Sequence, residues 1–187
     1  MRHARLLFVL AFLAALWAIV YFSGIRDHFT LQFVHDTVAS HPITGLLLFV
    51  ALFSAGNLIQ IPGWVFLAAA VLTLGQFWGG IATYLAASVS CVLTFVLIRL
   101  LGGNALRSFE GPLAKRIFAR LDTHPVQSVA LLRLLFQTVP ALNYALAMSG
   151  IRLRSYVIGT LLGLPLPIAL YALFLQTLAR WLKWPLP

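Results

Sequence analysis

The sequence predicts an all-α integral membrane protein, a helical bundle with two opposed re-entrant helical hairpins in an inverted repeat and with interfacial amphipathic helices. The first reason is composition: 61% of the 187 residues are hydrophobic and 9% are charged, whereas a soluble domain carries about 25% charge. The second is that the apolar residues form runs long enough to cross a bilayer. The third is that two of these runs contain proline and polar residues in their interior, as the broken helices of transporters do.

The charge balance is strongly basic, with 13 Lys and Arg against 4 Asp and Glu, for a net charge of +9. In a soluble protein this excess would favour a nucleic-acid partner. Here the basic residues lie between apolar runs, where they orient helices and meet anionic lipid headgroups. We therefore expect membrane lipids as partners and no nucleic acid. The single cysteine, Cys91, cannot form an intramolecular disulfide.

The N-terminal part of the chain predicts one crossing helix and one surface helix. The apolar run 6–22 follows basic residues and resembles a signal peptide, but it is long for one and lacks a clean cleavage site. We interpret it as a retained transmembrane helix. The segment 25–41 is too polar to span and too apolar for a solvated loop, so we expect an interfacial helix. Residues 1–187 are expected to form a single membrane domain.

The first half contains an apolar stretch that is too long for one crossing. Residues 43–74 would form a straight helix of about 48 Å, against a hydrocarbon core of about 30 Å. Pro62-Gly63 near its middle lacks the amide and the stiffness of a continuous helix. A re-entrant hairpin accounts for the length, and two short crossings also would. A glycine-rich turn at 75–80 and a crossing helix at 81–101 should follow.

The second half repeats this order of elements. Residues 105–124 are basic and amphipathic and should lie on the membrane surface. The second broken segment, 126–148, contains Pro140, and a third crossing follows at 156–178. The hairpin units are thus 43–101 and 126–178.

The distribution of basic residues predicts a multi-pass protein of the cell membrane with a cytoplasmic N-terminus. In that orientation the two hairpins enter from opposite faces. The side of the C-terminus stays open, because it depends on whether 126–148 spans.

Arg133 is the most informative candidate residue, because a charge inside the hydrocarbon is costly and marks function. On a helix, Gln137, Pro140 and Tyr144 share its face. Three interpretations stay open. Arg133 reaches the cytoplasmic interface by snorkelling, it ties down a hairpin tip, or it contacts the phosphate of a lipid or substrate through its bidentate fork.

Further candidates for headgroup contact lie near both breaks and at one helix end. Asn57, Gln60 and Asn143 could line a polar cavity or could hydrogen-bond between helices. Arg99 lies near a helix end, where anchoring at the interface is the simpler interpretation. The structural breaks themselves are assigned to Pro62, Gly63 and Pro140.

The residues that usually carry enzyme chemistry are poorly placed. No histidine lies in an apolar run and no serine or cysteine there has an evident partner, so we expect no catalysis, metal or cofactor. The four acids all fall in predicted surface segments: Asp27, Asp36, Glu110 and Asp122. A proton-driven carrier usually keeps an acid at membrane depth, and this chain has none there.

Several short motifs, in this order and spacing over residues 40–175, resemble a known family. The first-half motifs are Ile61-Pro62-Gly63, the glycines Gly75, Gly79 and Gly80, and Phe95-x-x-x-Arg99-x-x-Gly102. The second-half motifs are Leu132-Arg133-Leu134, Pro140, Asn143-Tyr144-Ala145-Leu146 and Tyr156-x-x-Gly159-Thr160-x-x-Gly163. The pattern is similar to the DedA superfamily, in particular its VTT-domain branch of SNARE-associated Golgi proteins. We expect six glycines of these motifs to let helices pack closely: Gly75, Gly79, Gly80, Gly102, Gly159 and Gly163.

The resemblance implies two facing re-entrant hairpins and the movement of phospholipid or a lipid-linked phosphate between leaflets, as a lipid transporter or scramblase. Trp64 stands where an acid often follows the Pro-Gly pair, and Asn143 stands where a second arginine is expected. These departures favour energy-independent scrambling over proton coupling. The alternatives are a proton- or ion-coupled carrier of small solutes and a membrane scaffold without transport activity. The sequence leaves homo-oligomerisation open.

Overall fold

The computed structural model describes residues 42–108 and 112–181, together with the isolated positions 11 and 18. Every regular element in these residues is a helix. The predicted N-terminal crossing at 6–22, the interfacial segment at 25–41 and the orientation of the N-terminus lie outside the described residues.

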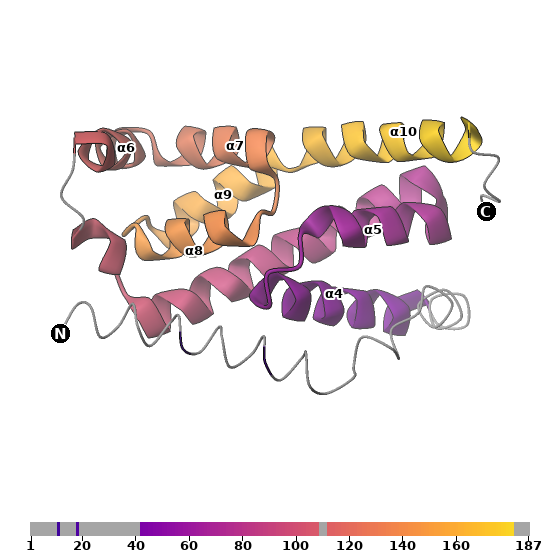
Figure 1. Cartoon of the computed structure of the whole chain (residues 1–187), viewed down its shortest axis with the longest axis horizontal. Helices are drawn as coiled ribbons and strands as arrows, with labels where there is room; N and C mark the ends of the chain where they lie inside the picture. Colours follow the sequence, from indigo (N-terminus) through magenta and orange to yellow (C-terminus); the bar gives the residue numbers. More distant parts are fainter. Residues whose placement is uncertain (1–10, 12–17, 19–41, 109–111, 182–187) are drawn as a thin grey trace.

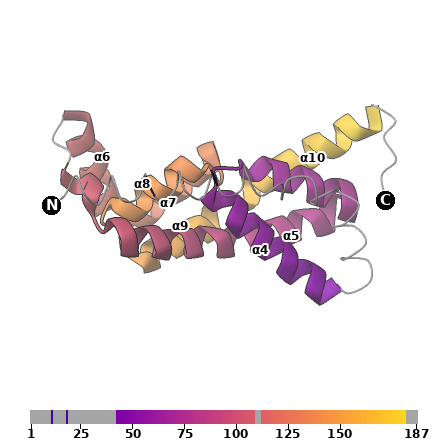
Figure 2. The same cartoon turned by 60° about the horizontal axis from the view of Figure 1, so that its bottom comes forward.

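The first broken segment forms two helices with a turn between them. Helix α4 (Pro42–Leu58) ends at Leu58, and α5 (Gly63–Gly102) begins after Pro62. A helix that continued through this point would need the amide of Pro62, which proline lacks, to bond the Leu58 carbonyl. The chain therefore turns at 59–62 and α5 packs back against α4 (Figure 1, Figure 2).

Helix α5 itself reverses direction at Gly75. This glycine has φ 78° and ψ 171°, a backbone conformation available to glycine and unfavourable for other residues. The two arms then run so close that a Cβ on Gly79 would lie 2.5 Å from the carbonyl oxygen of Ala70. The turn predicted over 75–80 is thus a reversal at one residue, and the second arm starts at Gln76 instead of Ile81.

The second half has a similar order of elements. The 3-10 turn η1 (Ala105–Ser108) and α6 (Pro112–Thr123) precede α7 (Pro125–Phe136). A break at 137–139 leads to α8 (Pro140–Met148), and Gly150, with φ 84°, leads to α9 (Leu153–Gly163) and α10 (Pro165–Trp181). The third predicted crossing is therefore two helices that bend at Leu164.

Both breaks use the same unusual backbone feature. Gln60 in the first break has φ 69° and Gln137 in the second has φ 50°. A positive φ is uncommon for a residue other than glycine, and it occurs where surrounding structure compensates its cost. In each half the sequence is therefore helix, glutamine, proline, short helix, glycine reversal and long helix.

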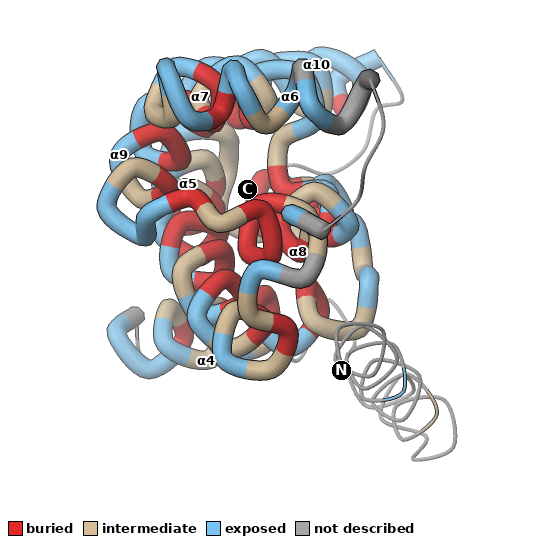
Figure 3. The backbone as a smooth tube through the Cα atoms, turned by 90° about the vertical axis from the view of Figure 1, so that its left-hand side faces the viewer, coloured by how far each residue is buried: buried red, intermediate tan, exposed pale blue. Residues whose placement is uncertain are grey.

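Helix packing brings the two halves together. Helices α8 and α10 pack on α5, whereas α7 packs on α9, and buried residues face the centre of the bundle (Figure 3). Glycines allow α7 and α9 to pack closely: a Cβ on Gly163 would lie 2.5 Å from the Ala130 carbonyl oxygen. Gly159 has a similar contact with α7, while an added Cβ at Gly75 or Gly80 meets no atom within 4 Å. Gly79, Gly159 and Gly163 therefore lie at close helix contacts, as expected, whereas Gly75 and Gly80 do not.

The outer surface of the bundle is apolar. Two stretches, Gly63–Gly102 and Leu153–Trp181, are helical, long and apolar enough to cross a membrane. Large hydrophobic side chains on them remain exposed, among them Leu93, Leu100, Leu162, Leu170 and Phe174. An exposed apolar surface of this extent is expected to contact lipid.

Candidate functional site

The two breaks meet inside the bundle. A Cβ built on Gly63, at the start of α5, would lie 1.9 Å from the hydroxyl oxygen of Thr138 in the second break. Pro62 and Pro140 thus flank two turns that touch each other. Because these turns are far apart in the sequence, their contact depends on the packing of the whole bundle.

A pair of asparagines joins the breaks. The Asn143 side-chain amide in α8 donates to Oδ1 of Asn57 in α4 over 3.0 Å. The Asn57 amide in turn donates to the hydroxyls of Ser90 and Thr94 in α5, at 3.0 and 3.3 Å. Asn57 and Asn143 are completely or almost completely buried, so both side chains hydrogen-bond between helices. Gln60, predicted with them, is exposed at the tip of the first break.

Tyr144 caps the end of α4. Its hydroxyl lies 2.8 Å from the Leu58 carbonyl oxygen and 3.1 Å from that of Asn57. The Leu58 carbonyl is the one whose helical partner would be the missing amide of Pro62. The first turn of α8 therefore satisfies a carbonyl that the first break leaves free.

Replacing Tyr144 by phenylalanine is expected to lower stability by about 1–3 kcal/mol, because it leaves this carbonyl without a donor in a water-free interior. Thermal unfolding in detergent would measure the change. Tyr171→Phe is the matched control, since Tyr171 is exposed on α10. Equal melting temperatures for the two variants would contradict the capping role.

Arg133 lies in the last turn of α7 and has no exposed surface. Its guanidinium donates to the hydroxyl of Tyr156 at 2.6 Å, to the Gln137 carbonyl at 2.9 Å and to the hydroxyl of Thr160 at 3.3 Å. The side chain thus points into the bundle instead of snorkelling to the interface. It also ties down the second break through Gln137.

Tyr156 connects Arg133 to the asparagine pair. Its hydroxyl, which accepts from Arg133, lies 3.3 Å from Asn143 Oδ1 and 3.1 Å from the Cys91 carbonyl oxygen. We call Asn57, Asn143, Arg133, Tyr156 and Thr160 the buried polar network. Tyr156 and Thr160 were not predicted as site residues from the sequence. The available signal was their spacing of four, which places them on one face of an apolar helix beside Gly159.

The network contains more donors than acceptors. A guanidinium carries five N–H donors, and the three bonds of Arg133 leave a further N–H on each terminal nitrogen. The side-chain nitrogen of Gln137 is also buried without a hydrogen-bond partner. Among the described residues, no carboxylate pairs with Arg133. This arrangement can accept an anionic group.

Two other arginines bind the end of α8. Arg99, near the end of α5, donates to the carbonyl oxygens of Ala147 and Ile151, and Arg107 donates to that of Ser149 at 2.6 Å. Cations near a helix C-terminus are favourable because the last carbonyls are unpaired and carry partial negative charge. Arg99 is therefore held within the protein, and not only at the interface as expected.

Arg107 also forms an ion pair with Asp122 in α6, through both oxygens of the carboxylate. Hydrogen bonding from Arg107 holds the pKa of Asp122 below its ordinary value. The pair therefore contributes to stability above the ordinary carboxyl pKa and loses this contribution as the pH falls through the lowered one.

Acidification from pH 6 to pH 3 is expected to destabilise the wild-type protein more than the Asp122→Asn variant. The difference should stay below about 1 kcal/mol, because the pair is largely exposed and screened. Thermal unfolding in detergent as a function of pH would measure it. Identical pH profiles would show that the pair does not stabilise the link between α6 and the end of α8.

A family model of the VTT domain matches residues 61–177, which is more than half of the chain. The chain belongs to the VTT-domain family. This is the domain of the DedA and SNARE-associated Golgi proteins, so the resemblance found in the motifs is confirmed. The match includes both prolines of the breaks and all of the buried polar network except Asn57. No curated protein and no solved structure matches the chain.

Membership of the VTT-domain family, together with the two long apolar stretches, makes the chain a membrane protein. VTT-domain proteins are generally not enzymes. In the part of the chain that the structure describes, no three His, Cys, Asp or Glu residues are grouped to hold a metal ion.

Proposed function

We propose that this VTT-domain protein moves phospholipids between the two leaflets of the cell membrane and that its buried polar network contacts the phosphate of the headgroup. The observation that carries the proposal is Arg133, a completely buried guanidinium with unused N–H donors. A buried cation without an anionic partner is unfavourable. A phosphate suits the planar fork of arginine and would supply the missing charge.

Gln137 supports the same assignment. Its buried side-chain nitrogen has no hydrogen-bond partner, and its backbone carbonyl oxygen already accepts a hydrogen bond from Arg133. Gln137 therefore offers a second unpaired donor in the same break as Arg133. Both residues belong to the second break, where the helical hydrogen bonding is interrupted and the backbone can adjust.

The lengths of the helices favour re-entrant hairpins. Helix α7 has 12 residues and α8 has 9, so they are about 18 and 14 Å long and neither crosses a hydrocarbon core of about 30 Å alone. The arm of α5 before Gly75 is similarly short. The repeated order of elements and the contact of the two breaks support hairpins that enter from opposite faces as an inverted repeat within one domain.

Helix α6 supports contact with anionic headgroups. It is an amphipathic helix in which Lys115, Arg120 and the apolar Ile117 are exposed. A helix of this kind lies in the interface of a membrane that contains anionic lipid. Together with a cytoplasmic N-terminus, this arrangement would place α6 on the cytoplasmic face.

Reconstitution into vesicles tests the transport proposal. Purified protein in vesicles that contain a trace of fluorescent phospholipid should let a membrane-impermeant quencher bleach more dye than the outer leaflet holds. Arg154→Met is the matched control, because it removes an exposed arginine outside the network and should leave exchange unchanged. Bleaching no faster than in empty vesicles, with folded protein, would overturn the proposal. Exchange that requires an imposed proton gradient would favour a coupled carrier.

A further inference from the structure

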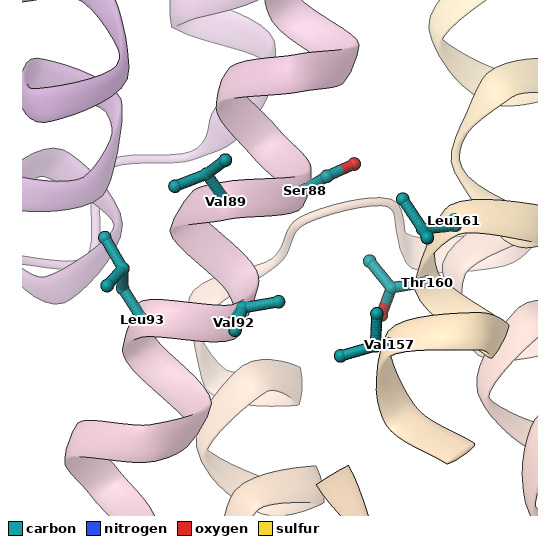
Figure 4. A pocket seen from close by; sticks show the side chains of 7 residues that line it. All are labelled: Ser88, Val89, Val92, Leu93, Val157, Thr160 and Leu161. Atoms are coloured by element: carbon teal, nitrogen blue, oxygen red, sulfur yellow. The ribbon is translucent and has the colours of Figure 1, made fainter. Parts of the chain in front are cut away.

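A cleft lies between α5 and α9, beside the buried polar network. Its volume is about 280 Å³, and its walls include Ser88 and Val92 of α5 and Val157, Thr160 and Leu161 of α9 (Figure 4). Thr160 also accepts the hydrogen bond from Arg133 Nε. The cleft and the buried cation are therefore separated by a single side chain.

The surroundings of the cleft identify the kind of group that would enter it. Val89 and Leu93 line it and are 43% and 53% exposed, so it opens onto the apolar outer surface of the two helical stretches that are long enough to cross the membrane. That surface is expected to contact lipid, and the cleft extends from it into the protein. A hydrocarbon chain of a membrane lipid fits these walls, whereas a water-soluble ligand would not reach them through the bilayer.

Tyr84 of α5 contacts Leu161, one of the residues that line the cleft. Its hydroxyl donates to the Leu161 carbonyl oxygen over 3.2 Å. That carbonyl lacks a helical partner, because the residue four positions on is Pro165. Tyr84 therefore links α5 to α9 at this point. Together with Pro165 it also lines a second cleft, between α5 and α10.

Ser88 gives the cleft a polar group without a partner. The residue is 92% buried and its hydroxyl forms no hydrogen bond. Ser54 and Thr73, in similar helical positions, donate back to the carbonyls of Val50 and Ala69. The Ser88 hydroxyl points instead toward Leu161 of α9 (Figure 4). A rotamer change of Leu161 would open it to an acceptor on a chain in the cleft.

We propose that the cleft binds one acyl chain of an ester-linked glycerophospholipid and that Ser88 donates to the ester carbonyl of this chain. The inference rests on the proposed lipid movement and narrows its substrate class. An ester carbonyl is the acceptor that such a lipid carries between its phosphate and its hydrocarbon. The phosphate would bind at Arg133, while the chain lies along Val92 and Val157. An ether lipid or a polyprenyl phosphate has no such carbonyl.

Photolabelling of the full chain in vesicles tests the proposal. The probes are two phosphatidylglycerols with the same diazirine on one chain, one ester-linked and the other ether-linked. We expect the ester lipid to label residues 88–93 and 157–161 about fivefold more than the ether lipid, as one hydrogen bond implies. Ser88→Ala should bring this ratio near one without lowering ether labelling, and Ser54→Ala should leave the ratio unchanged.

A second variant distinguishes binding of the acyl chain in the cleft from hydrogen bonding by the Ser88 hydroxyl. Val92→Phe fills the space and should reduce labelling by both lipids. Equal labelling by ester and ether lipids in the wild-type protein, or labelling that avoids both segments, would overturn the inference. Lipid exchange without labelling of the cleft would overturn it and leave the transport proposal standing. Labelling without exchange would support the cleft and count against transport.

Discussion

Replacement of Arg133 by methionine is expected to reduce lipid exchange at least about tenfold while the protein stays folded. The lost hydrogen bonds from a charged donor to phosphate account for the first effect, since each is typically worth about 1.5–3 kcal/mol. The methionine variant is expected to stay folded because Arg133 is buried. Exchanging a buried charge for an apolar side chain of similar length is often neutral or stabilising, and the guanidinium has no carboxylate partner in the described residues.

The comparison with Arg133→Lys separates charge from geometry. Lysine keeps the positive charge but cannot bond Tyr156, Thr160 and Gln137 together, so we expect intermediate exchange and lower stability than for methionine. Exchange would be measured in vesicles and stability by thermal unfolding in detergent. If the methionine variant unfolds much more easily than wild type and exchanges lipid at the wild-type rate, Arg133 is a structural residue only.

The breaks in the two apolar segments could be predicted from elementary constraints. A proline cannot donate the hydrogen bond that a continuous helix requires, and residues 43–74 are too many for one crossing. These local facts located the ends of α4 and α7 to within a few residues. The limit on helix length is the same whatever the helices contact.

Other features depend on contacts between distant segments. The bond between Asn57 and Asn143 spans 86 residues, and periodicity within one helix carries no information about such a partner. The same holds for Tyr156, whose position in an apolar run predicts burial but not its bond to Arg133. The positive φ at Gln60 and Gln137 also lacks a local signal, because glutamine has no preference for this conformation.

The contact between the breaks also explains how they persist in a medium without water. Each interruption leaves backbone groups unpaired, which is costly in hydrocarbon unless other groups satisfy them. Tyr144 of α8 bonds the end of α4, and Arg133 of α7 bonds the Gln137 carbonyl. The first break is thus capped by the second half of the chain. This dependence predicts that the first hairpin does not fold independently of the second half.

Substituting Gly63 by alanine should test that dependence directly. The new Cβ would lie 1.9 Å from the Thr138 hydroxyl oxygen and 3.2 Å from the Phe53 ring. Since neither break can move without disturbing the buried polar network, we expect a loss of about 1–3 kcal/mol in stability, typical of overpacking. Thermal unfolding in detergent would measure it, with Gly80→Ala as a control because an added Cβ there meets nothing within 4 Å.

The double variant Gly63→Ala with Thr138→Ala distinguishes contact between the breaks from a local effect on α5. Removing the Thr138 hydroxyl eliminates the 1.9 Å contact and leaves Thr138 Cβ at 3.2 Å, a distance that small shifts accommodate. The double variant should therefore be more stable than the sum of the two single changes predicts, by at least about 0.5 kcal/mol. Strict additivity would mean that the two turns do not touch in the membrane. The opposed-hairpin arrangement would then lose one of its main supports.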